Sequence, residues 1–193
     1  MKKLLAITVL SLCLVIPSQA EDIRDFQVDG ISVGDYLLSH YTENELSNGV
    51  KSYYPNKKFY LLDLSSKDTN YDNIQFALKR KDKNFKIYGI TGAILKPFSN
   101  CLKKQKEITK EITAQFDNLK VIDKIIYDHP ADKTGKSKKK DVEIVFTKTS
   151  ELIVVDCVDW SKKITKKNGW QDNLGVSLYT KEYENWLRNK AFN

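Results

Sequence analysis

Cys101 and Cys157 are the two residues whose chemistry the sequence marks most clearly. Cys101 lies in PFSNCLKKQKEI, Cys157 lies in ELIVVDCVDWS, and the third cysteine, Cys13, belongs to the apolar N-terminal segment. In an oxidising compartment, two cysteines indicate a disulfide first. The alternatives are two free buried thiols or a metal pair. No histidine lies near either cysteine to complete a zinc site, and the redox motif C-x-x-C is absent.

The segments around the two cysteines predict a helix and a strand. From Ser99, SNCLKKQKEITKEITAQFDNL repeats apolar residues at helical spacing, and Ser99 or Asn100 can cap its start. The predicted apolar stripe consists of Cys101, Ile108, Ile112, Phe116 and Leu119. Cys157 shares one face of a β-branched strand with Ile153 and Val155. A disulfide would therefore fasten the helix to a sheet, and closing so long a loop stabilises by about 4 kcal/mol in the chain-entropy model.

Other residues with catalytic potential form no recognisable constellation. His40 and His129 are the only histidines and lie far apart in the sequence, which favours surface or turn positions. Phosphate-binding glycine loops and serine nucleophile motifs are absent. Asp156 and Asp159 form a carboxylate pair of the kind that a glycosidase uses across a cleft, although caps and turns are the default roles. We therefore assign no catalytic residue, metal ligand or cofactor from the sequence.

The densest basic run, KTGKSKKK, is a candidate for contact with an anionic surface such as lipid headgroups. The candidate residues are Lys136, Lys138, Lys139 and Lys140, and the alternative is a solvated loop tip. No aromatic residues are interleaved with these lysines, and the chain is poor in arginine, so nucleic acid is not expected as a partner. Trp170 lies in a polar segment, KKNGWQDN, and is a candidate exposed binding aromatic.

The N-terminus has the layout of a secretory signal peptide. MKKLLAITVLSLCLVIPSQA has a basic head, an apolar core too short to span a bilayer, and small residues before a cleavage site between Ala20 and Glu21. A retained membrane anchor is one alternative. A lipoprotein modified at Cys13 is another, although Leu12 stands where a small residue is expected. We predict a signal peptide over 1–20, a single domain over 21–193 without a transmembrane helix, and a periplasmic or secreted location.

The remaining pattern predicts an α+β fold with a mostly antiparallel sheet. Short helices are expected at 33–40 and 43–48, and a long helix follows Pro97. Strands are expected at 58–65, 74–80 and 85–95, then at 120–128, 141–148, 151–160 and 173–180. The segments 129–140 and 161–172 are expected to be loops, and a helix after Thr180 ends the chain.

Several stretches resemble a known class of exported proteins. DGISVGDYLLSHYTENEL, YDNIQFALKRKDKNFKIYGITGAI and DCVDWS with NLGVSLYTKEYENWL resemble uncharacterised small exported (periplasmic) proteins of AT-rich marine bacteria, and this resemblance implies no activity. Over residues 30–46, ISVGD followed by a helix also resembles outer-membrane assembly lipoproteins of the BamE type.

The combined observations favour a non-catalytic binding or envelope-accessory module. The alternative is a hydrolase that acts on an envelope polymer. The sequence names no partner; an envelope protein or an anionic surface fits the charge pattern. A deep pocket that holds two carboxylates would favour the enzyme, and a groove or an open sheet edge would favour the binding module.

Overall fold

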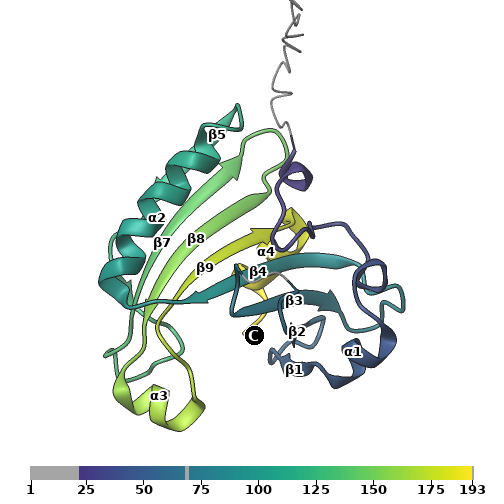
Figure 1. The fold of residues 1–193 in the computed structure, drawn as a ribbon, viewed down its shortest axis with the longest axis horizontal. Coiled ribbons are helices and arrows are strands. Elements are labelled where there is room, and N and C mark those ends of the chain that lie inside the picture. The colour runs from purple at the N-terminus through teal and green to yellow at the C-terminus, as the bar shows by residue number, and fades with distance from the viewer. Residues whose placement is uncertain (1–21, 68–69, 193) are drawn as a thin grey trace, which may run out of the picture.

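The computed structural model describes residues 22–67 and 70–192, and in these residues it shows the predicted α+β fold. The predicted signal peptide and its cleavage site at Ala20 and Glu21 lie outside the described residues. One curved antiparallel sheet runs through the molecule, with helices against it and one helix beyond the ends of its strands (Figure 1).

The sheet has the strand order β1-β2-β3-β4-β9-β8-β7-β5, with β6 paired to β7. Its strands are β1 (Val50–Tyr53), β2 (Phe59–Leu64), β3 (Asn73–Lys79), β4 (Ile87–Leu95), β5 (Leu119–Asp123), β6 (Tyr127–Asp128), β7 (Lys138–Phe146), β8 (Leu152–Asp159) and β9 (Asn173–Tyr179). Strands β2, β3 and β4 form the predicted meander, and β7 and β8 form the predicted hairpin. The last strand, β9, enters between β4 and β8 and joins the two halves into one sheet.

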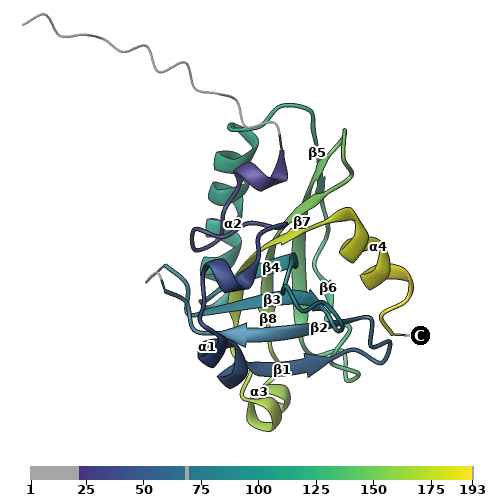
Figure 2. The same ribbon diagram turned by 90° about the vertical axis from the view of Figure 1, so that its right-hand side faces the viewer.

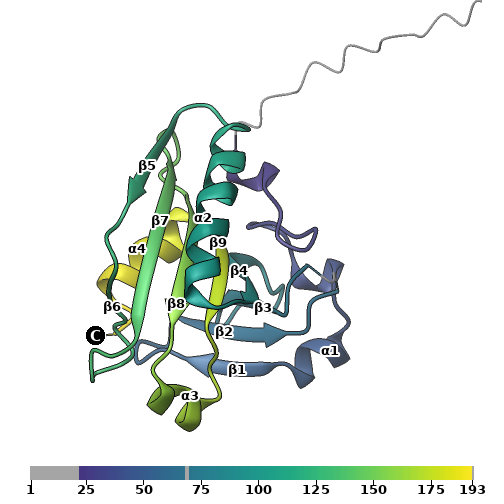
Figure 3. The ribbon, with the colours of Figure 1, turned by 60° about the vertical axis from the view of Figure 1, so that its left-hand side comes forward.

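The helices cover the two faces of the sheet unequally. They are α1 (Glu43–Asn48), α2 (Phe98–Thr113), α3 (Lys162–Asn168) and α4 (Lys181–Asn189), with 3₁₀ turns at Ile23–Asp25 and Leu37–Ser39. Helix α2 packs on β7, β8 and β9, and α4 lies on the other side of these strands (Figures 2 and 3). Within the described ranges, no helix is long and apolar enough to cross a membrane.

The main core lies on the α2 face, where alternate strand residues point inward. Ile74, Phe76 and Leu78 of β3 belong to this core, together with residues of α1, α2 and the N-terminal segment. A smaller aromatic core forms under α4, whose Tyr183 and Trp186 pack on Phe59. Both faces of the sheet are therefore packed, and only part of the face opposite α2 carries polar side chains.

The predicted disulfide between Cys101 and Cys157 is confirmed. The two residues are fully buried, with their Cα atoms 5.8 Å apart, and they link α2 to β8. Helix α2 begins one residue before the predicted Ser99, with Pro97 at the N-cap and no side-chain cap. One turn after Cys101, the buried Gln105 donates hydrogen bonds to the backbone carbonyls of Lys140 and Val155, at 3.0 and 2.7 Å. The helix is thus fixed to the sheet by a covalent bond and by polar contacts.

Five local predictions were wrong. The expected helix at 33–40 is only a 3₁₀ turn, the expected strand at 120–128 is divided into β5 and β6, and α3 occupies part of the expected loop at 161–172. The fourth error concerns the expected loop at 129–140, because β7 already begins at Lys138. The fifth concerns the helix from Ser99, which was expected to carry Phe116 and Leu119, whereas α2 ends at Thr113 and Leu119 begins β5. Strand β1 was not predicted, since its four residues are all exposed and give no alternation.

Candidate functional site

A cluster of ionised side chains lies on the sheet face opposite α2. Because Cys157 points toward α2, its neighbour Asp156 points to the other face. Asp141 of β7 lies directly opposite Asp156 in the β7–β8 register, and Lys139 lies two residues earlier on the same face. We call these three residues, together with Tyr127 of β6, the acid–lysine cluster.

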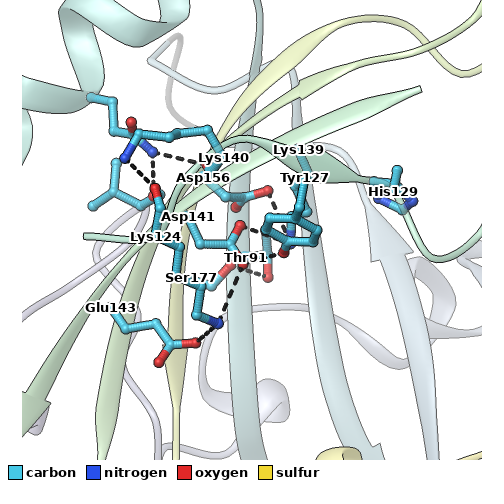
Figure 4. A network of polar contacts seen from close by, with 12 residues as sticks. Thr91, Lys124, Tyr127, His129, Lys139, Lys140, Asp141, Glu143, Asp156 and Ser177 are labelled. Atoms are coloured by element: carbon cyan, nitrogen blue, oxygen red, sulfur yellow. Dashed lines mark hydrogen bonds and ion pairs between the residues drawn. The ribbon is translucent and has the colours of Figure 1, made fainter. Parts of the chain in front are cut away.

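The lysine of this cluster bridges the two carboxylates. Lys139 Nζ lies 3.3 Å from Asp141 Oδ1 and 3.5 Å from Asp156 Oδ2. The side chains of Lys139, Asp141 and Asp156 are 24%, 7% and 13% exposed, so the ions are largely withdrawn from water. The Tyr127 hydroxyl donates a hydrogen bond to Asp141 Oδ2 (Figure 4).

Burial and charge together set the protonation of the cluster. Burial lowers the pKa of Lys139, but the charges of Asp156 and Asp141 outweigh this effect and raise the pKa above its ordinary value. Burial raises the pKa of Asp156, and Lys139 opposes that shift. Burial also raises the pKa of the Tyr127 hydroxyl. The lysine therefore stays protonated and the tyrosine stays neutral at physiological pH.

The cluster holds two carboxylates and one lysine, and a second cation, Lys124, lies with its Nζ 3.8 Å from Asp141 Oδ2. Each carboxylate contacts Lys139, and Asp141 also accepts a hydrogen bond from the Tyr127 hydroxyl. The space beside Asp156 exists because β9 carries Gly175, where a Cβ atom would lie only 2.4 Å from Asp156 Oδ1. This glycine makes room for the carboxylate itself, and the arrangement is that of a buried structural ion group.

Sequence reasoning paired the wrong carboxylates. Asp159 is three residues from Asp156 along β8, so the two side chains alternate to opposite faces. The partner of Asp156 is Asp141, which comes from the neighbouring strand. The signal that could have identified it is the alternation of charged and apolar residues in KDVEIVF, once that segment is placed beside β8.

A second ion network continues from the cluster to α4. Glu143 Oε1 accepts hydrogen bonds from Lys124 and from Arg188 Nη2, the latter at 2.8 Å, and Arg188 Nε contacts Glu184. Burial raises the pKa of Glu143, but the hydrogen bonds from Lys124 and Arg188 outweigh burial and lower it. The network ties the C-terminal helix to β7.

Three of the four lysines predicted to contact an anionic surface have carboxylate partners. Lys138 pairs with Asp128, Lys139 lies inside the acid–lysine cluster, and Lys140 pairs with Asp123. All three lysines belong to β7, and their carboxylate partners lie on β7 itself or on a strand paired with it. Lys136 is exposed in the preceding loop. The contact of this basic run with an anionic surface stays a prediction.

Trp170 is exposed, as the sequence predicted, and belongs to an aromatic group that the sequence did not reveal. Its ring lies 4.7 Å from that of Trp160, which lies 4.2 Å from the ring of His129 on its other side. Burial and the charge of Lys139 lower the pKa of His129 to about 4. The histidine is therefore neutral at physiological pH and acts as a flat packing partner.

A pocket of about 620 Å³ lies at the other end of the sheet, between the β1–β2 and β3–β4 connections. We call it the basic pocket, and its lining residues are Lys57, Lys58, Lys79, Arg80, Lys81, Asp82 and Tyr88. Sequence reasoning missed it, because the five cations come from two segments, 57–58 and 79–81, that are separated by β2 and nearly all of β3.

No protein-family model matches the chain. A search of curated proteins likewise finds no significant similarity, so the resemblances drawn from the sequence stay predictions. Across residues 22–67 and 70–192, there is also no group of three or more histidine, cysteine, aspartate or glutamate side chains that could hold a metal ion. Any assignment of function must therefore come from the geometry of the sites described above.

Proposed function

We propose that the protein is an exported, non-catalytic binding module that attaches to an anionic surface through the basic pocket. Export is supported by the layout of the N-terminal segment and by the disulfide between Cys101 and Cys157, since disulfides persist in oxidising compartments. The observation that carries the proposal is the convergence of five cations at one end of the sheet.

The charges of this pocket are only partly compensated. Glu182 of α4 contacts Lys58 and Lys79, each at 2.9 Å. For Lys57, Arg80 and Lys81, the structure shows no carboxylate within 4.0 Å among the residues it describes, and their side chains are exposed. These three cations are available to phosphate or carboxylate groups, whereas the lysines of β7 are not.

Exposed aromatic rings flank the same end of the sheet. Tyr53 ends β1, and Phe192 packs its ring edge against Tyr54 with ring centroids 5.6 Å apart; both Tyr53 and Phe192 are more than half exposed. The backbone amide of Asn56 donates to the carbonyl oxygen of Ala191, which holds the C-terminal residues beside the β1–β2 connection. Cations beside an exposed tyrosine ring suit the headgroup region of an anionic membrane.

The test compares binding to vesicles of phosphatidylglycerol with binding to vesicles of phosphatidylcholine. We expect the parent to bind the anionic vesicles only, and the K57S/R80S/K81S variant to bind them up to about 150-fold more weakly, at about 1 kcal/mol or roughly fivefold per cation. The matched control is K103S/K106S/K110S, which removes three exposed lysines from α2 and should bind like the parent. Equal loss in both variants would indicate a net-charge effect, and no loss in the first would reject the basic pocket.

The acid–lysine cluster provides the one specific argument for the alternative, a hydrolase of an envelope polymer. It contains two buried carboxylates on neighbouring strands, and burial raises the pKa of Asp156. If it were an active site, the parent would release soluble fragments from peptidoglycan, and D141N and D156N would each abolish the release. We expect no release from the parent, because Lys139 already occupies the space between the two carboxylates.

A further inference from the structure

Strand β5 forms one border of the sheet, because it ends the strand order and, within the described residues, pairs with β7 alone (Figure 3). We call its outer side the β5 border. Beside it, the side chains of Val121, Ile125 and Ile126 are 46%, 84% and 48% exposed. Apolar side chains that gather on a protein surface mark a candidate contact site.

The backbone of β5 directs hydrogen-bonding groups toward this border. In an antiparallel pair, residues that exchange N–H···O bonds with the neighbouring strand alternate with residues whose N–H and C=O groups point away from it. The amide of Lys124 donates to the carbonyl oxygen of Asp141 at 3.0 Å. Just before β5, the carbonyl oxygen of Asn118 accepts from the amide of Thr147 at 3.1 Å. The even-numbered residues of β5 are therefore bonded to β7, and the odd-numbered residues point their backbone groups outward. These odd-numbered residues are Leu119, Val121 and Asp123.

The outward backbone groups fit an extended polypeptide. They recur at every second residue, a repeat of about 6.8 Å, and a second strand at a distance of about 4.8 Å presents its own N–H and C=O groups with the same repeat. Main-chain bonds of this kind hold any extended chain, so the side chains beside them determine which chain is favoured.

The charges on one face of the border favour an acidic side chain. On the face that Lys124 shares with Glu143, β5 carries Lys120 and Ile122, so this face of β5 has no acidic residue. Lys124 is paired with Glu143. Lys120 is exposed, and the structure shows no carboxylate within 4.0 Å of it in the part of the chain that it describes. An acidic residue directly opposite Lys120 on an added strand would supply the charge partner.

A second copy of the chain suits this border less well. A two-fold axis between two β5 strands places residues of the same number parity opposite one another. With the axis at Lys120, that lysine faces Lys120 of the other copy, and with the axis at Ile122 it faces Lys124, so both registers oppose like charges. With the axis at Val121, Lys120 faces Ile122. None of these registers gives Lys120 an anionic partner.

We propose that the β5 border binds an extended segment of a partner protein, which adds to the sheet as a strand and places an acidic side chain opposite Lys120. On the other face of the added strand, an apolar side chain lies beside Val121. This inference goes beyond the attachment proposed above, because it concerns other residues and another class of partner.

The test measures binding of a fluorescein-labelled peptide, TVEVEVT, to the purified protein by fluorescence anisotropy. Its sequence reads the same in both directions, so it fits a parallel or an antiparallel strand. We expect a Kd below about 1 mM. The peptide TVKVKVT should bind about fivefold more weakly, because it places like charges opposite Lys120. TVEPEVT should also lose at least about fivefold, because proline removes an amide that faces the border. K120Q should reduce the difference between the two charged peptides to about twofold, and the matched control K103Q on α2 should keep it.

A proline at position 121 tests the backbone of the border directly. V121P removes an amide that points outward and leaves the bonds between β5 and β7 in place, so it should bind TVEVEVT at least about fivefold more weakly. V121T keeps this amide and should bind like the parent. The proline peptide and K120Q keep the proposal falsifiable if V121P fails to fold.

K57S/R80S/K81S should bind TVEVEVT like the parent, which separates the β5 border from the basic pocket. The proposal is overturned if TVEVEVT does not bind, if a folded V121P binds it like the parent, or if K120Q keeps the full difference between the charged peptides. Sedimentation that shows a dimer of the parent and a monomer of V121P would also overturn it, because a second copy would then occupy the border.

Discussion

Replacing Lys139 by methionine removes the cation of the acid–lysine cluster and keeps most of the length of the side chain. Lys139 Nζ lies 3.3 and 3.5 Å from the carboxylates of Asp141 and Asp156, which are 7% and 13% exposed. Breaking a buried ion pair by removing one partner costs about 3–5 kcal/mol, because the remaining charge is left without compensation. We expect the free energy of unfolding near pH 7 to fall by about this amount, which is a large part of the ~5–15 kcal/mol of an ordinary domain.

The effect of Lys139→Met should depend on pH. Burial raises the pKa of Asp156 and Lys139 opposes that shift, so without the cation the pKa of Asp156 in the folded state rises further above its unfolded value. The folded variant then binds a proton more readily than the unfolded chain, so acidification stabilises it relative to the parent. The loss should be largest near neutrality and should shrink as the pH falls toward the raised pKa of Asp156. Urea unfolding near pH 7 and near pH 5 measures the difference.

Two variants serve as controls for this prediction. Lys103→Met removes an exposed lysine from α2 and should leave the free energy of unfolding nearly unchanged. The combined K139M/D141N/D156N variant removes all three charges and should recover much of the loss. A loss below about 1 kcal/mol for Lys139→Met, or an equal loss at both pH values, would show that the carboxylates do not depend on this lysine.

Three further results are expected. The free energy of unfolding of the C101S/C157S variant, measured in urea, should be about 4 kcal/mol lower than that of the parent, because the disulfide closes a long loop and restricts the unfolded chain. A loss below about 1 kcal/mol would show that the disulfide does not stabilise the fold in this way. The lowered pKa of His129, about 4, means that the unfolded chain takes up its proton first, so stability should be lost as the pH falls from about 6.5 to about 4. His129→Asn should flatten that part of the stability curve, and an unchanged slope would assign it to other groups. Gly175→Ala should lower the melting temperature, because the new Cβ collides with Asp156 at a cost of about 1–3 kcal/mol; adding Asp156→Ala should relieve that collision.

The sequence was sufficient wherever an apolar pattern determined the structure. The apolar stripe of α2 and the β-branched run of β8 placed Cys101 and Cys157 on facing surfaces, and the disulfide follows from that placement. The meander of β2, β3 and β4 was predictable because alternation and turn residues agree there. Trp170 was predicted to be exposed because its neighbours are polar.

The sequence was insufficient where long-range pairing determined the structure. Lys138, Lys139 and Lys140 appeared to belong to a solvated loop, since three consecutive lysines have no apolar periodicity. They lie in β7, and their carboxylate partners Asp128, Asp156 and Asp123 come from separate segments. The basic pocket was not predictable for the same reason, because it gathers residues from connections that only the sheet brings together.

The strand order leaves the sheet unclosed, and this has a consequence for the protein at high concentration. Strands β1 and β5 end the order, and next to β5 the side chains of Val121, Ile125 and Ile126 are exposed. An unpaired strand border with apolar side chains is a template for self-association. The exposed Lys120 of β5 places a charge on this border, and it opposes the pairing of one copy with another that would otherwise lead to fibres.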